Sequence, residues 1–196
     1  LTALSLDKGF CFLGPPVSDG FGFSVSEAGD INGDGVDDFI ISSTTAITTG
    51  TTNAGVVYVI FGNKNGFSDI DLATGLSPTQ GFKINGVEAG ESFGWSLSGA
   101  GDINGDGISD LAIGAVFSPY TPASLSSAGA AYVLFGKRNW TPTTINMAGV
   151  LPPNDGFKVQ GSSLNSYFGH AINIVGDING DGVDDLVVGA PGENSA

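Results

Sequence analysis

The chain of 196 residues has little positive charge and almost no cysteine. Six Lys and Arg residues stand against 20 Asp and Glu residues, which gives a formal net charge of −14. Because nucleic acids and anionic membrane surfaces are bound through positive charge, we expect neither partner. Cys11 is the only cysteine, which excludes an internal disulfide framework. No segment approaches the roughly 20 apolar residues of a membrane-spanning helix, so we also expect no membrane insertion.

Glycine and short apolar stretches are abundant instead. The sequence contains 32 Gly, and 41% of its residues are hydrophobic while only 13% are charged. A disordered acidic segment has far fewer apolar residues, so this composition favours a folded domain. The apolar stretches are short and alternate with clusters of Gly, Asn, Asp, Ser and Pro, which is typical of an all-β protein.

An acidic segment of nine residues occurs three times, as DINGDGVDD at 30–38, DINGDGISD at 102–110 and DINGDGVDD at 177–185. A Phe of a second repeated motif (Phe10, Phe82 and Phe157) precedes each copy by the same distance of 20 residues. Self-similarity at a fixed period indicates a repeat architecture. The sequence divides into the repeat units 9–80, 81–155 and 156–196, of which the third is incomplete. Each complete unit contains four short predicted strands, and such units predict the blades of a β-propeller.

The acidic segment offers oxygen atoms at alternate positions. Its positions 1, 3, 5 and 9 are Asp, Asn, Asp and Asp in every copy, and position 7 contributes a backbone carbonyl. Hard cations such as Ca²⁺ take six to eight oxygen ligands of these kinds, and glycines at positions 4 and 6 permit the sharp bend. We therefore predict three Ca²⁺ sites. Their ligands are Asp30, Asn32, Asp34, Val36 and Asp38; Asp102, Asn104, Asp106, Ile108 and Asp110; and Asp177, Asn179, Asp181, Val183 and Asp185.

Two other interpretations of this segment are weaker. An EF-hand loop needs a Glu at position 12 and a helix on each side, but position 12 is Ile41, Ile113 or Val188 within a predicted strand. A simple hairpin turn accounts for Asn-Gly and Asp-Gly but not for three Asp in every copy, which would repel one another without a cation. Magnesium is less suitable than calcium because it keeps more of its waters.

The order of the motifs resembles the FG-GAP repeat, which forms the β-propeller of integrin α subunits and of bacterial relatives. A Phe-Gly pair precedes each acidic segment, at 21–22, 93–94 and 168–169. Only the third unit completes the final motif, as Gly189-Ala190-Pro191, and this departure leaves the predicted metal loops unchanged. The resemblance implies a seven-bladed propeller with calcium in loops on its lower face and with ligand binding, when present, through loops on the opposite face.

The resemblance also implies an order for the strands. The first strand of a blade starts at the Phe-Gly pair, the metal loop joins it to the second, and the fourth strand is the outer edge. Counted in this way, the chain contains eleven strands, or about two and a half to three blades of a propeller segment that spans 1–196. We expect it to belong to a longer propeller, or to complete its ring with further blades from the same or another chain.

The expected function is that of a calcium-binding interaction module, secreted or at the cell surface, which binds a protein or carbohydrate partner in adhesion. No nucleophile–base pair stands out, so we expect no enzyme. Two alternatives remain open at this point. In the first, the chain is a structural unit of a large surface or filament protein. In the second, it is a polysaccharide-acting enzyme whose site lies in the upper-face loops, where Glu88 and Glu91 occur.

Aromatic side chains are the remaining candidates for a binding role. Tyr120, Trp140 and Tyr167 lie in predicted loops and are candidate ligand contacts. His170 is the only histidine, and it occupies the position that Phe23 and Trp95 occupy in the other two repeats. This alignment predicts that His170 fills a packed position and has no catalytic role.

Overall fold

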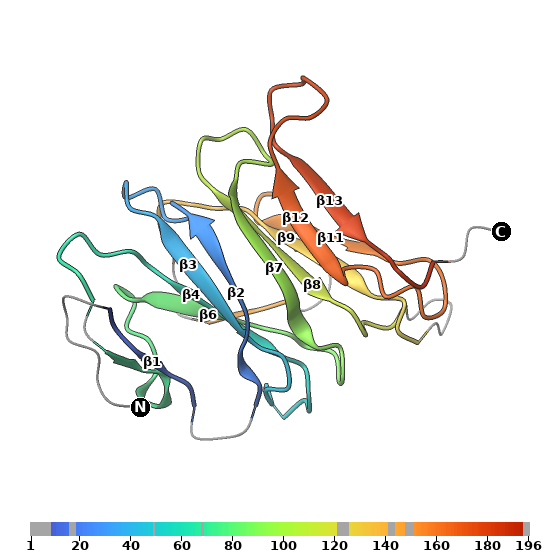
Figure 1. Cartoon of the computed structure of the whole chain (residues 1–196), viewed down its shortest axis with the longest axis horizontal. Helices are drawn as coiled ribbons and strands as arrows, with labels where there is room; N and C mark the ends of the chain where they lie inside the picture. Colours follow the sequence, from blue (N-terminus) through green and yellow to red (C-terminus); the bar gives the residue numbers. More distant parts are fainter. Residues whose placement is uncertain are drawn as a thin grey trace.

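The computed structural model describes residues 9–15, 19–48, 50–67, 69–120, 126–140, 144–147 and 151–193. Within these residues the chain forms thirteen strands and one short 3-10 helix, η1 (Figure 1). The elements are β1 (Phe12–Leu13), β2 (Phe21–Gly29), β3 (Asp38–Ser43), β4 (Val56–Ile60), β5 (Ile70–Asp71), η1 (Leu72–Thr74), β6 (Gly81–Asn85), β7 (Phe93–Gly101), β8 (Asp110–Ala115), β9 (Ala130–Leu134), β10 (Thr144–Asn146), β11 (Gly156–Gln160), β12 (Ala171–Val175) and β13 (Asp185–Gly189). No helix in this described part of the chain has the length and apolar character needed to cross a membrane.

Two complete blades and the first half of a third form the body of the molecule. The first blade has the strand order β6-β4-β3-β2 and the second β11-β9-β8-β7, with antiparallel neighbours throughout. β12 and β13 pair as the first two strands of the third blade. The inner strands β2, β7 and β12 lie side by side (Figure 1). The expected all-β fold is confirmed, and the stacked blades are a segment of a β-propeller.

The middle strands of a blade are buried on both faces. In β4, Val57 and Val59 pack into the core between the first and second blades, whereas Tyr58 and Ile60 pack into a separate core on the opposite face. Successive side chains of a strand point to opposite faces. A blade enclosed by neighbours on both sides therefore needs apolar residues at every position of this strand, which explains why the sequence VVYVI does not alternate.

The Phe-Gly pair fastens each blade to the preceding one. The Phe93 N–H donates to the Ala54 carbonyl at 2.9 Å, and the Phe168 N–H donates to the Ala128 carbonyl at 3.1 Å. A Cβ atom on Gly55, whose φ is +90°, would lie 2.2 Å from the Phe93 carbonyl oxygen. Only glycine permits such an approach, so the Ala-Gly before the third strand serves the contact between blades.

Two strands were not expected from the sequence. β5 and β10 lie in the connectors between the third and fourth strands of a blade, and we use the term connector for residues 61–80 and 135–155. They pair in parallel with β1 and β6, which are the outer strands of the preceding blades. The eleven expected strands are present, and each connector adds one more strand to the rim of its neighbour.

Candidate metal loops and an aromatic row

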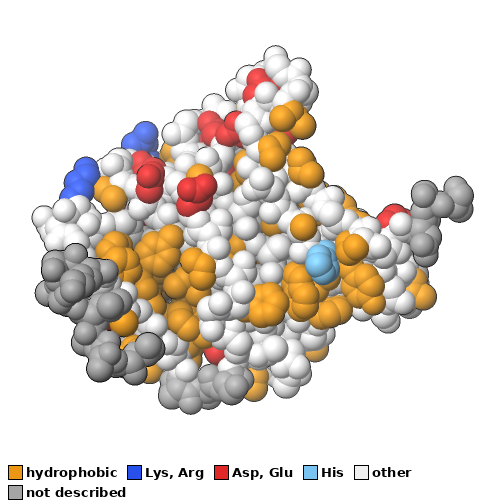
Figure 2. Space-filling model, in the orientation of Figure 1, with side chains coloured by type: hydrophobic (Ala, Val, Ile, Leu, Met, Phe, Trp, Pro, Cys, Tyr) orange, Lys and Arg blue, Asp and Glu red, His pale blue; other side chains and the backbone are white. Residues whose placement is uncertain are grey.

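The three acidic segments form loops at the same end of successive blades. Each loop joins a first strand to a second strand, that is, β2 to β3, β7 to β8 and β12 to β13. Figure 2 shows acidic side chains grouped along the corresponding edge of the molecule. The repeat therefore places the same four side-chain oxygen donors, Asp, Asn, Asp and Asp, at an equivalent point of each blade.

Side-chain oxygens hold the first six positions of each loop in a tight turn. In the first loop the Asp30 carboxylate accepts the N–H groups of Asp34 and Gly35 at 2.9 and 2.8 Å. The Asn32 Oδ1 also accepts the Asp34 N–H, at 2.9 Å. Corresponding bonds recur in the second and third loops, where Asp102 and Asp177 act as the acceptors. The Asn32 bond is an Asx turn, in which a side-chain oxygen accepts the N–H two residues further on, and the Asp30 carboxylate spans the rest of the loop.

Glycines supply the backbone conformation that these turns require. Gly33 and Gly35 have φ values of 69° and 84°, and the glycines of the other two loops are likewise in the left-handed region. A side chain at such a position strains the backbone. The expected reason for glycine at positions 4 and 6 of the segment is thus present in all three copies.

The ninth residue anchors the loop to the blade. Asp38 is 3% exposed, and its carboxylate accepts the N–H groups of Ile31 at 3.1 Å and Gly62 at 2.7 Å. Asp110 forms the equivalent bonds with Ile103 and Gly136, both at 2.8 Å. Burial raises the pKa of Asp38 and of Asp110 to about 6, although the backbone N–H groups favour the ionised form.

The pKa of Asp177, the first residue of the third loop, is shifted in the opposite direction from those of Asp38 and Asp110. The Asp177 carboxylate lies at the surface and accepts N–H bonds from Gly180, Asp181 and Gly182. The Gly182 N–H chiefly, together with those of Gly180 and Asp181, lowers the pKa of Asp177, because these bonds stabilise the charged carboxylate. An ionised carboxylate at position 1 is the form that a cation would bind.

The chemistry of the donor set fits a hard cation. Each loop supplies three carboxylates and one amide oxygen, with no nitrogen or sulfur ligand, and this favours calcium over zinc or copper. In the part of the chain that the structure describes, no three acidic, His or Cys side chains converge on a common point. The carboxylates bond to backbone N–H groups of the loop instead, so the case for a metal rests on the donors and their repetition.

A partly exposed aromatic row is the second candidate site. It consists of five residues, Phe23, Trp95, Phe117, Tyr167 and His170. The ring of Trp95 lies 5.0 Å from that of Phe23, 5.6 Å from that of Phe117 and 5.9 Å from that of His170. Figure 2 shows the histidine among hydrophobic side chains on the surface. Four of these residues, all except Phe23, line a cavity of about 470 Å³.

The aromatic row corrects one expectation from the sequence. The alignment of His170 with Phe23 and Trp95 is right, but the prediction that His170 fills a packed position is wrong. His170 is exposed, and Phe23 is 50% exposed. The three side chains follow the Phe-Gly pair on inner strands or at their start, where no neighbouring blade covers them. The sequence does contain a signal for this row, because Phe23, Trp95 and His170 occupy the same position in the three repeats.

Comparison with known proteins agrees with the loops and the blades. Residues 21–60, 93–134 and 168–196, more than half of the chain, match the FG-GAP repeat. The chain belongs to the FG-GAP repeat family. Each matched range begins at the Phe-Gly pair, and each contains one acidic loop between its first and second strands. The family assignment therefore rests on the segments that carry the candidate metal ligands.

Proteins similar to this FG-GAP chain include integrin α subunits. Integrin alpha-PS3 of Drosophila melanogaster is 33% identical over 187 residues, which are 95% of this chain and 15% of the relative. Integrin alpha pat-2 of Caenorhabditis elegans is 41% identical over 99 residues, 48% of this chain and 7% of the relative. A phosphatidylinositol-glycan-specific phospholipase D of Dictyostelium discoideum is 33% identical over 170 residues, 83% of this chain and 17% of the relative. The chain thus spans less than a fifth of each of these relatives.

The structure brings together some of the predicted ligands and not others. Asp30, Asn32 and Asp34 share hydrogen bonds within one turn, as do their counterparts in the other loops. Asp38 and Asp110 bond instead to the start of the loop and to the start of the connector that follows the third strand. Trp140, a candidate ligand contact, stacks on Phe82 at a ring distance of 4.3 Å and is therefore part of the packing.

Proposed function

We propose that this FG-GAP chain is a calcium-stabilised interaction module that acts outside the cell and binds a protein or carbohydrate partner in adhesion. One observation carries the calcium part: the same oxygen donors recur in three loops, each held by the same backbone bonds at the same point of its blade. In each loop, the residues at positions 1, 3, 5 and 9 would hold the cation with their side chains and the residue at position 7 with its carbonyl. The bound ion would supply positive charge and link the two strands that meet at the loop.

The charge of the chain supports the same proposal. Three Ca²⁺ ions would change the formal net charge from −14 to −8, because each ion adds two positive charges. Repulsion among the carboxylates of a loop would fall accordingly. Extracellular calcium loops of low affinity are occupied at millimolar calcium, which agrees with a location outside the cell. The integrin α relatives support the adhesion part of the proposal.

Removal of calcium tests this proposal. A ligand that binds only the folded state stabilises it, so we expect EDTA to lower the melting temperature by about 10 °C and added Ca²⁺ to restore it. Asp34→Asn should weaken calcium binding in calorimetry, since it replaces a carboxylate with a neutral amide of the same shape. Asp37→Asn is the matched control, because it removes the same charge from an exposed neighbour. Equal calcium binding by both variants, or a melting temperature unaffected by EDTA, would contradict the proposal.

The aromatic row is the surface that we assign to the partner. Exposed aromatic patches mark interaction sites, since the rings lose water on contact and stack on other side chains or on sugars. We expect Trp95→Ala to reduce binding of the immobilised chain to a panel of matrix proteins and polysaccharides. Ile47→Ala, at an apolar residue outside the row that is 70% exposed, is the control. If both variants bind like the wild type, the partner contacts a different face.

We infer that the chain itself is not an enzyme. The phospholipase D relative carries an activity in its name, but the matched part is only 17% of that protein. The two carboxylates named for the polysaccharide-acting alternative have structural partners: Glu91 is buried and accepts the Tyr132 hydroxyl at 3.1 Å, and Glu88 accepts the Ser118 hydroxyl at 2.8 Å. Incubation with a glycosylphosphatidylinositol-anchored protein should leave the anchor intact, and release of the protein would overturn this inference.

A further inference from the structure

Asn-Gly pairs are the positions at which a chain modifies itself most readily. The backbone nitrogen of the glycine attacks the side-chain carbonyl of the asparagine, and glycine has no Cβ atom that would obstruct this approach. Asparagine is accordingly counted among the thermolabile residues. The sequence contains five such pairs, at 32–33, 65–66, 85–86, 104–105 and 179–180. Three of the five are positions 3 and 4 of the acidic loops, so this chemistry concerns the candidate metal ligands directly.

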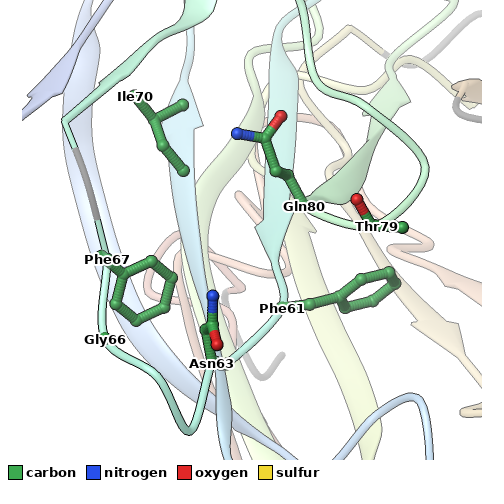
Figure 3. A pocket seen from close by; sticks show the side chains of 8 residues that line it. Phe61, Asn63, Gly66, Phe67, Ile70, Thr79 and Gln80 are labelled. Carbon is green, nitrogen blue, oxygen red and sulfur yellow. The ribbon is translucent and has the colours of Figure 1, made fainter.

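A hydrogen bond from the glycine N–H opposes the reaction, because the nitrogen must lose its proton to attack. In the first connector the Gly66 N–H donates to the Asn63 carbonyl at 2.9 Å, and Figure 3 shows both residues in this turn. Directly after β6, the Gly86 N–H donates to the Gly55 carbonyl, also at 2.9 Å. The asparagine of this second pair, Asn85, is buried. We therefore expect both pairs to react slowly.

In the second and third acidic loops the acceptor of the glycine N–H is negatively charged. The Gly105 N–H donates to the Asp102 carboxylate at 2.7 Å, and the Gly180 N–H donates to the Asp177 carboxylate at 2.6 Å. Repulsion between like charges disfavours an amide anion beside a carboxylate. The asparagines of these two pairs also donate their side-chain amides to carboxylates, at 3.0 Å in both cases. Hydrogen bonds thus restrain the nucleophile and the leaving group of both pairs.

The first acidic loop differs at Gly33, whose N–H has no acceptor among the described residues. The Asp30 carboxylate accepts the N–H groups of Asp34 and Gly35 instead. The Arg138 Nη1 donates to the Gly33 carbonyl at 3.1 Å, which places a positive charge beside this residue. A nearby positive charge favours the anionic form of the attacking nitrogen. The surroundings of Gly33 therefore promote attack.

The side chain of Asn32 is also prepared for the reaction. Its Oδ1 accepts the Asp34 N–H at 2.9 Å, and this bond draws electrons away from Cγ, the atom under attack. Its Nδ2 donates no hydrogen bond within the described part of the chain, so the leaving group is not restrained there. Asn32 and Gly33 are half-buried, so water reaches the pair.

We propose that Asn32 is a self-modification site, at which deamidation is faster than at the other four Asn-Gly pairs. A bond forms between the Gly33 nitrogen and Asn32 Cγ, the Cγ–Nδ2 bond breaks, and ammonia leaves with the proton of the Gly33 N–H. The resulting succinimide ring then adds one water molecule. Opening of the ring at Cγ gives aspartate, and opening at the backbone carbonyl gives isoaspartate, in which the main chain passes through Cγ.

Either product alters the first acidic loop at its third position. Aspartate adds a fourth carboxylate to those of Asp30, Asp34 and Asp38, whereas isoaspartate lengthens the main chain by one carbon atom and displaces the donors that follow. The inference rests on hydrogen bonds and not on a bound cation. Its failure would leave the calcium proposal standing, and a failure of the calcium proposal would leave it unaffected when the reaction is followed in EDTA.

Peptide mapping by mass spectrometry tests this inference on the 196-residue chain, which is incubated at pH 9 in EDTA and then digested at acidic pH. We expect Asn32 to deamidate at least about five times faster than Asn179, because a hydrogen bond to a carboxylate protects the latter pair. The segments 30–38 and 177–185 are identical in sequence, so only the fold distinguishes the two asparagines. In concentrated urea both should react at the same rate.

A charge variant tests the contribution of Arg138. Arg138→Ala should slow deamidation of Asn32 by about threefold, since it removes the positive charge beside Gly33. Lys83→Ala removes an equal charge from an exposed position on β6 and should leave the rate unchanged. Should Arg138→Ala fail to fold, the comparison of Asn32 with Asn179 in the wild-type chain still decides. Deamidation of any other Asn-Gly pair in the folded chain as fast as that of Asn32 would overturn the proposal.

Discussion

The sequence DINGDGVDD occurs unchanged at 30–38 and at 177–185, and the two copies have different surroundings. Both form the same turn, in which the first Asp accepts the N–H groups of positions 5 and 6. At the ninth position they differ. Asp38 is buried and bonds to Gly62 of the first connector, whereas Asp185 is half-exposed and bonds to the Asn179 amide of its own loop. Local sequence thus dictates the turn, and the neighbouring strand dictates how firmly the loop is anchored.

The largest expected effect comes from removing the ninth Asp in each copy. In EDTA, Asp38→Ala leaves the N–H groups of Ile31 and Gly62 without their acceptor, and should lower the free energy of unfolding by about 2–4 kcal/mol. Asp185→Ala should cost about 1 kcal/mol, since water can replace an exposed carboxylate. Urea unfolding followed by tryptophan fluorescence measures both. Equal losses would show that the connector contact does not anchor the first loop.

Much of the fold could be predicted from the sequence because the repeat aligns local features. The Phe-Gly pair, the acidic loop and the apolar strands follow one another within one blade, so their spacing survives as a recognisable period. β5 and β10 could not be found in this way, since each is short and pairs with a strand of another blade. The sequence indicates these strands only through the similarity of Ile70-Asp71-Leu72 to Ile145-Asn146-Met147. Both segments lie outside the most constant part of the repeat.

The candidate sites were predictable to different degrees. Residue types alone identify the loop donors, because oxygen atoms at alternate positions are meaningful without any knowledge of the fold. The aromatic row needs the fold, since an aromatic residue on a strand is packed or exposed according to the blade next to it. Trp140 illustrates the same limit: it was a candidate ligand contact, but its stacking on Phe82 depends on the path of the connector.

At position 8 of the two identical copies, the third loop and not the first has the contact with a neighbouring blade. Asp184 of the third loop accepts the Asp102 N–H of the second loop at 2.8 Å, whereas Asp37 of the first loop is exposed. Asp184→Ala should therefore lower the free energy of unfolding by about 1.5 kcal/mol, and Asp37→Ala by less than about 0.5 kcal/mol. Thermal melting of both variants measures this difference. A larger loss of stability for Asp37→Ala would contradict this, because it would show that the bond between Asp184 and the second loop does not determine the stability of the chain.

The smallest effect concerns a pair of equivalent positions at the opposite end of the blades. Glu91 in the second repeat and Ser166 in the third both lie buried two residues before the Phe-Gly pair. Burial raises the pKa of Glu91, although the N–H groups of Glu88 and Val87 bond to its carboxylate. A folded-state pKa above the unfolded value means that Glu91 contributes stability below about pH 4.3, which is lost as the pH rises through the folded pKa.

Substitution of these two residues should separate a buried charge from a buried hydroxyl. Glu91→Gln keeps the acceptor for the two N–H groups and cannot ionise, so its melting temperature should exceed that of the wild type at pH 8 and approach it toward pH 4. Ser166→Ala removes the bond from the Ser166 hydroxyl to the Ala128 carbonyl and should destabilise the chain equally at both pH values, since serine does not titrate. If Glu91→Gln melts at a lower temperature than the wild type at pH 8, the two N–H bonds stabilise the ionised carboxylate by more than burial destabilises it. The second repeat would then fill this buried position with a charged group, where the third repeat uses a hydroxyl.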